Sequence, residues 1–112
     1  MAIANLDGAG MPELVYAGMA VRVDASTKAM TTIFNHKVNG GHWGVMTAVA
    51  DVDLDGSPDI IVGNRIYSAT GVDKTPSAVR TFGGGYVAIA QFDKTTPEPE
   101  IVLISSQTSS PG

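Results

Sequence analysis

One sequence pattern returns three times along this chain of 112 residues. Each copy has a short run of small and apolar residues, a polar turn, a proline followed by an acidic residue, and a second apolar run. The copies align on Ala4, Ala50 and Ala90, which are 46 and 40 residues apart. Short strands that return at about this period are typical of the blades of a β-propeller. The sequence therefore predicts an all-β chain of four-stranded antiparallel sheets.

The apolar runs also predict the individual strands. In the first repeat we expect strands at 2–5, 14–17, 19–23 and 30–34, and in the second at 46–50, 60–62, 65–68 and 78–82. The third repeat has strands at 86–90 and 101–104, followed by a polar tail. The expected units are blade 1 (1–46), blade 2 (47–86), half of blade 3 (87–105) and the tail (106–112). We expect no α-helix, and an incomplete propeller of about two and a half blades.

The most chemically specific segment lies between the first two strands of the second repeat. Residues 51–59 read Asp-Val-Asp-Leu-Asp-Gly-Ser-Pro-Asp. Alternation brings Asp51, Asp53 and Asp55 to one side of a short loop, where their mutual repulsion is costly without a counter-ion. Calcium suits such a site because it accepts six to eight oxygen ligands in a flexible shell, whereas softer metals prefer His or Cys.

The end of this loop offers further ligands. Gly56 permits a sharp turn, Ser57 can present its backbone carbonyl, and Asp59 meets the ion as the next strand begins. An EF-hand is excluded, because its twelfth position must be Glu and here it is Val62. The alternative is a solvated acidic turn, since Asp and Gly are ordinary turn residues.

Charge and composition restrict the classes of partner. The chain has 7 basic and 11 acidic residues, a formal charge of −4, and no cysteine. Four of the acids lie in the 51–59 loop, so the acidity is local. The absence of a basic stripe argues against nucleic acid, and no segment is long and apolar enough to span a membrane. Without Cys there is no disulfide or thiol chemistry, although an oxidising compartment is not excluded.

The repeats resemble the FG-GAP or VCBS-type repeats of the integrin alpha-subunit propeller and of many bacterial surface proteins. Three features carry the resemblance: the run Ala-Val-Ala-Asp-Val-Asp-Leu-Asp-Gly-Ser-Pro-Asp-Ile-Ile-Val-Gly at 48–63, its weaker echoes at 2–18 and 88–105, and Phe-Gly-Gly-Gly at 82–85. The resemblance implies a structural Ca²⁺ in the loop between the first two strands of a blade. Its ligands would be the side chains of Asp51, Asp53, Asp55 and Asp59 and the carbonyl of Ser57.

The echoes depart from this ligand pattern. The corresponding positions are Asn5, Asp7, Ala9 and Glu13 in the first repeat, and Gln91, Asp93, Thr95 and Glu100 in the third. Each echo has two carboxylates instead of four, so the attraction for a cation is weaker while the dehydration cost remains. We expect these loops to be metal-free turns or weak sites.

A possible ligand-binding loop lies between the first two repeats, in Asn-His-Lys-Val-Asn-Gly-Gly-His-Trp-Gly at 35–44. Within it, His42 and Trp43 are the candidates, because an exposed Trp can stack on a sugar. The alternative is that Trp43 packs between blades, since a lone Trp is a large apolar surface to leave in water. His36 and His42 lack the spacing of a zinc pair. The Gly run at 83–85 lacks the features of a phosphate loop and reads as a turn.

Together these features predict a calcium-stabilised, non-enzymatic module of a secreted or cell-surface protein that binds a protein or a glycan, as in cell adhesion. Fold does not decide function. A propeller fragment of a polysaccharide lyase or other carbohydrate-active enzyme, and a purely structural scaffold, are the alternatives. Because 112 residues are too few to close a propeller, we also expect self-association or pairing with a complementary propeller segment.

Overall fold

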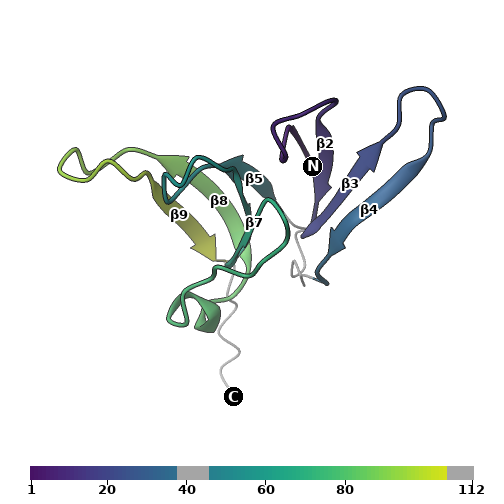
Figure 1. The fold of residues 1–112 in the computed structure, drawn as a ribbon. Helices are drawn as coiled ribbons and strands as arrows, with labels where there is room; N and C mark the ends of the chain where they lie inside the picture. The colour runs from purple at the N-terminus through teal and green to yellow at the C-terminus, as the bar shows by residue number, and fades with distance from the viewer. Residues whose placement is uncertain (38–45, 106–112) are drawn as a thin grey trace, which may run out of the picture.

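The computed structural model describes residues 1–37 and 46–105, and these form three antiparallel sheets (Figure 1). The all-β prediction is confirmed, and the described residues contain no α-helix. None of them belongs to a helix capable of crossing a membrane. The predicted tail at 106–112 lies outside the described residues.

Sheet A is the first repeat and has four strands in sequence order, as predicted. They are β1 (Ala2–Ala4), β2 (Glu13–Tyr16), β3 (Met19–Val23) and β4 (Met30–Asn35). The strand β2 ends at Tyr16 because Ala17 and Gly18 both have positive φ, 48° and 79°. Two such residues make the tight hairpin turn whose twist matches the flanking strands.

Sheet B has three strands, β5 (Thr47–Ala50), β6 (Asp59–Val62) and β7 (Arg65–Ser68). Residues 63–64 form the turn that joins β6 to β7, with Gly63 at φ 55°. The predicted fourth strand at 78–82 is wrong, because this segment forms a 3₁₀ helix, η2 (Val79–Thr81).

Local contacts explain why 78–82 is a helical turn. The carbonyl of Pro76 accepts the N–H of Val79, and Arg80 pairs with Asp73 at 3.0 Å. The edge of β7 is instead occupied by residues just before the turn. Asp73 bridges Tyr67, and the N–H of the next residue, Lys74, donates to a β7 carbonyl at 2.8 Å. This extended segment carries Lys74 alongside the loop between β5 and β6.

Sheet C pairs β8 (Gly85–Ala90) with β9 (Glu100–Ser105), close to the predicted strands of the third repeat. Each sheet keeps the same pairing at its acidic residue. Ala4 faces Glu13, Ala50 faces Asp59, and Ala90 faces Glu100. The sequence repeat is therefore also a repeat of strand register.

Sheet B lies between the other two sheets (Figure 1), with β1 in contact with β5 and β5 in contact with β8. The first strand of each sheet thus lies next to the first strand of its neighbour. The core between sheets A and B contains the buried residues Leu6, Val15, Ala20, Ile60, Val62 and Tyr67. Within the described residues the three sheets do not close into a ring.

Candidate metal site

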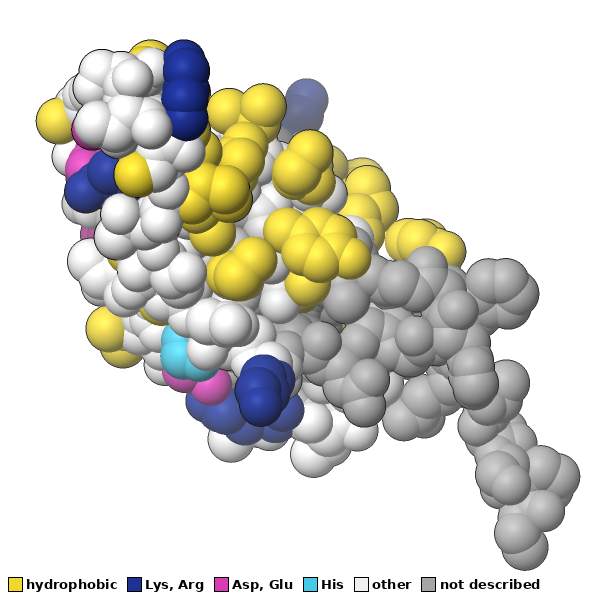
Figure 2. Space-filling view, turned by 90° about the vertical axis from the view of Figure 1, so that its right-hand side faces the viewer, with side chains coloured by type: hydrophobic (Ala, Val, Ile, Leu, Met, Phe, Trp, Pro, Cys, Tyr) yellow, Lys and Arg dark blue, Asp and Glu magenta, His cyan; other side chains and the backbone are white. Residues whose placement is uncertain are grey.

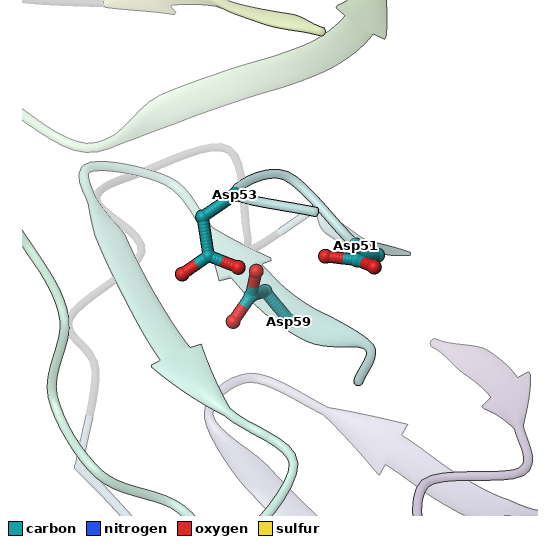
Figure 3. A group of neighbouring side chains, drawn as sticks. All are labelled: Asp51, Asp53 and Asp59. Carbon is teal, nitrogen blue, oxygen red and sulfur yellow. The ribbon is translucent and has the colours of Figure 1, made fainter. Parts of the chain in front are cut away.

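The acidic loop connects β5 to β6, and the pairing of these strands brings its two ends together. Because Ala50 lies opposite Asp59, the residue after β5, Asp51, lies close to the first residue of β6. Asp51, Asp53 and Asp59 each offer a carboxylate oxygen within 4.8 Å of the other two (Figure 3). Three of the four predicted side-chain ligands therefore converge at one place.

Backbone N–H groups hold the loop around these carboxylates. Asp51 accepts the N–H groups of Asp55, at 3.1 Å, and of Gly56, at 2.9 Å. Asp59 accepts the N–H of Val52 at 3.1 Å and is only 1% exposed. The loop reverses direction at Gly56, whose φ of 90° suits glycine best. A buried carboxylate that accepts a backbone N–H fixes both ends of the loop.

A fourth predicted ligand, Asp55, lies at the margin of this cluster. Asp55 is half exposed and is not one of the three converging carboxylates. It accepts the N–H of Ser57 at 2.8 Å, an ordinary turn contact. Asp51, Asp53 and Asp59 thus form the centre of the site, which we call the acidic triad.

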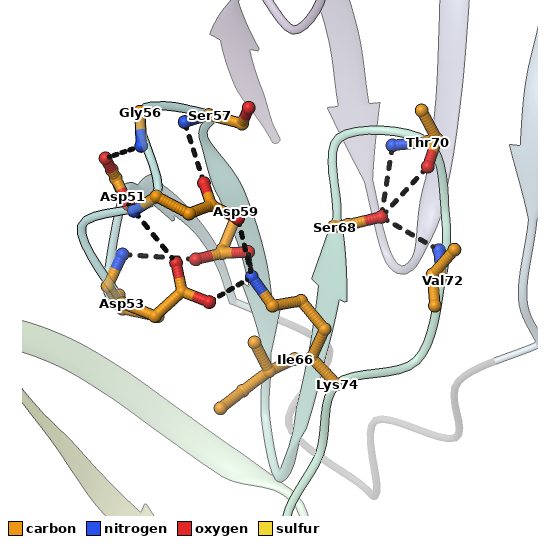
Figure 4. Close-up of polar contacts among 12 residues, drawn as sticks. Asp51, Asp53, Gly56, Ser57, Asp59, Ile66, Ser68, Thr70, Val72 and Lys74 are labelled. Atoms are coloured by element: carbon orange, nitrogen blue, oxygen red, sulfur yellow. Dashed lines mark hydrogen bonds and ion pairs between the residues drawn. The ribbon is translucent and has the colours of Figure 1, made fainter.

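A lysine that the sequence analysis did not single out enters this site. The Lys74 ammonium lies 2.5 Å from Asp53, 2.8 Å from Asp59 and 3.4 Å from Asp55 (Figure 4). Its hydrogen bond lowers the pKa of Asp53, and the bonds to Asp53 and Asp59 in turn raise the pKa of Lys74. Lys74 therefore stays charged and neutralises part of the acidic loop.

The loop between β1 and β2 in sheet A has an equivalent arrangement, in which an arginine takes the place of Lys74. Glu13, fully buried, accepts the N–H of Leu6 at 2.9 Å, as Asp59 accepts that of Val52. Arg22 donates to Glu13 at 3.1 Å and also pairs with Asp7. A guanidinium thus lies between the two carboxylates of the first loop and neutralises part of their charge. That this loop is a metal-free turn or a weak site stays a prediction.

The third loop, between β8 and β9, has the hydrogen bond from a backbone N–H to a carboxylate but, within the described residues, lacks the paired basic side chain. Glu100 accepts the N–H of Phe92 at 2.7 Å, while Asp93 binds the N–H and hydroxyl of Thr95. Among the described residues no basic side chain pairs with either acid. Only two of the positions equivalent to the predicted ligands are carboxylates, Asp93 and Glu100, and the structure gathers no acidic triad in this part of the chain.

The predicted ligand-binding residues His42 and Trp43 lie outside the described residues. Their neighbour His36 has a packing role. Its ring stacks on Tyr67 with centroids 4.3 Å apart, and its Nε2–H donates to the carbonyl of Gly71 at 2.6 Å. His36 thus joins sheet A to sheet B.

Lys74 was not identifiable from sequence because it is 15 residues from Asp59 and reaches it only through the pairing of residues 73–75 with β7. Arg22 would have been easier to identify, because it lies on β3, which pairs directly with β2, the strand that begins with Glu13. A comparison of the chain with protein-family models, curated protein sequences and solved structures found no match.

Proposed function

We propose that the chain is a calcium-stabilised β-sheet module of the FG-GAP or VCBS-repeat type, which binds a protein or carbohydrate at a cell surface or in a secreted protein. The observation that supports it is the convergence of Asp51, Asp53 and Asp59 within 4.8 Å. The donors are all carboxylate oxygens, which suit a hard cation, and no His or Cys belongs to the group.

The fit of calcium depends on how the ion and Lys74 share the site. Lys74 is one positive charge beside three carboxylates, whereas Ca²⁺ supplies two charges and takes more oxygen ligands. In this proposal the ion binds the acidic triad and the Lys74 ammonium moves away from it. Asp55 and the Ser57 carbonyl complete the shell as the loop tightens.

Calorimetric titration of Ca²⁺ into chelator-treated protein tests this proposal. We expect one dominant site, which Asp53→Ala abolishes. The matched control is Asp7→Ala in the first loop, where Arg22 already neutralises the acids, and this variant should bind calcium like the wild type. Binding unaffected by Asp53→Ala, or equal binding at three sites, would refute the assignment.

A second variant tests the competition with Lys74. Lys74→Met removes a positive charge from the site, and one charge at a few ångströms in an effective dielectric of about 20 is worth several kcal/mol before solvent screening. We expect calcium affinity to rise about tenfold after that screening, because Lys74 is partly exposed. Unchanged or weaker affinity would mean that the ion does not bind where Lys74 lies.

The binding role is tested separately with labelled protein on a glycan array and on cells. Retention that is lost on chelation and in Asp53→Ala supports a calcium-dependent binding module. Absence of retention on both surfaces would instead favour the purely structural alternative.

A further inference from the structure

Among the described residues, sheet B has both of its faces covered by other sheets, whereas sheets A and C each have only one face covered. Ile60 and Val62 of sheet B are 0% exposed in the core with sheet A. Ile61, which points to the other face, is 1% exposed, and with Ile66 it borders an apolar pocket of about 180 Å³ against Ile101 and Leu103 of sheet C. Sheet B is therefore the reference for a repeat whose two faces are both packed against other sheets.

The shared register allows the same positions to be compared in all three sheets. Each sheet has an alanine opposite an acid, and the residue two positions after that alanine is Leu6, Val52 or Phe92. The residues one and three positions after the acid are Leu14 and Tyr16 in sheet A, Ile60 and Val62 in sheet B, and Ile101 and Leu103 in sheet C. Side chains at equivalent positions point to equivalent faces.

In the part of the chain that the structure describes, no sheet covers the face of sheet C that corresponds to the face of sheet A packed on sheet B. Leu6 is 5% exposed in the A–B core, but its counterpart Phe92 is 68% exposed. On the same face Tyr86 and Ile104 are paired in register and are 45% and 67% exposed. This face has the pattern of a packed surface without the sheet that would cover it.

No other described sheet packs on the opposite face of sheet A, the face that in sheet B packs against sheet A. Tyr16 is 54% exposed where its counterpart Val62 is fully buried, and Ile3, paired with Leu14 on this face, is 65% exposed. On the side of the molecule where sheet A lies, hydrophobic side chains gather into a patch (Figure 2). Exposed apolar patches of this kind mark interaction surfaces.

We propose that these two faces bind each other between molecules, so that the free face of sheet A packs on the free face of sheet C of a second copy. The contact repeats between chains the packing that sheet A makes with sheet B within one chain. A second copy fits because the two faces are complementary. The free face of sheet A corresponds to the face of sheet B that packs on sheet A, and the free face of sheet C corresponds to the face of sheet A that packs on sheet B. The two faces are different, so the contact is head-to-tail and generates rings or open chains.

Light scattering on the full chain, in calcium-containing buffer, tests the proposal. We expect a mass that rises with concentration to multiples of 11.6 kDa. A monomer at every concentration up to the millimolar range would overturn it and leave the two faces to a partner of another sequence.

Paired variants test the head-to-tail geometry. Tyr16→Lys blocks the face of sheet A and Phe92→Lys the face of sheet C, so each variant alone should be monomeric. Mixed in equal amounts, they still share one intact pair of faces and should form a dimer that grows no further. Val72→Lys, at a residue 62% exposed between β7 and Asp73, is the control and should assemble like the wild type.

Either of two outcomes would overturn the geometry: single variants that still assemble, or a mixture that stays monomeric. Circular dichroism must show that the variants keep the β-sheet signal. If Tyr16→Lys does not fold, Ile3→Lys blocks the same face from β1, and the mixing experiment is repeated with it.

Discussion

At the scale of single residues, the buried carboxylate of Glu13 holds the loop between β1 and β2 in place. It is 0% exposed, accepts the Leu6 N–H and pairs with Arg22. Glu13→Ala leaves a buried N–H without an acceptor and should lower the free energy of unfolding by about 3 kcal/mol. Urea denaturation measures this loss. Glu98→Ala, at an exposed position, should stay within about 0.5 kcal/mol of the wild type, and equal effects of the two variants would contradict this role.

A second residue-scale prediction concerns pH. The Asp24 carboxylate accepts the N–H of Thr27 and the hydroxyl and N–H of Ser26, which lower its pKa from 3.8 to about 2. Since the folded pKa is the lower one, the turn gains stability above pH 4 and loses it as the pH falls toward 2. Carbon NMR titration should give a midpoint near 2, shifted upward in Ser26→Ala. A midpoint of 3.8 would show that these bonds do not form in solution.

At the scale of elements, Gly71 controls how the segment after β7 approaches sheet A. Its φ is 88°, and an added Cβ would lie 2.6 Å from the Phe34 ring. Gly71→Ala therefore combines left-handed backbone strain with overpacking and should cost about 3 kcal/mol in denaturant unfolding. Gly10→Ala has similar strain at φ 69° but open space around it, so it should cost only about 1 kcal/mol. Equal losses would mean that contact with Phe34 is unimportant.

The strands show how far sequence reasoning reaches. The strand β3 was predicted residue for residue, because its apolar run is bounded by the turns at 17–18 and 24–27. The segment 78–82 was misassigned because a short apolar alternation does not distinguish a strand from a helical turn. The contacts that accompany the turn, from Val79 to Pro76 and between Arg80 and Asp73, are local, but the alternation of apolar residues does not reveal them.

The candidate site also has a part that the sequence predicts and a part that it does not. The convergence of Asp51, Asp53 and Asp59 follows from their spacing between paired strands, which the sequence contains. The position of Lys74 depends on how residues 73–75 lie against β7, and no local pattern encodes that.

At the scale of the whole molecule, the three sheets share one hydrogen bond in their acidic loops and differ in the cation that pairs with the carboxylate. In each loop a carboxylate accepts a backbone N–H seven or eight residues earlier: Leu6 to Glu13, Val52 to Asp59, and Phe92 to Glu100. Sheet A adds an arginine, sheet B adds a lysine and, in our proposal, a calcium ion, and sheet C has no basic partner among the described residues.

The central claim is that calcium binds the folded acidic loop, and thermal unfolding with saturating calcium or with chelator tests it most directly. An ion that binds only the folded loop adds about 2.7 kcal/mol at a hundredfold excess over Kd, which corresponds to about 10 °C in Tm for a chain of this size. We predict such a rise for the wild type and for Asp7→Ala, and none for Asp53→Ala. A wild-type Tm that is the same in calcium and in chelator would contradict the account.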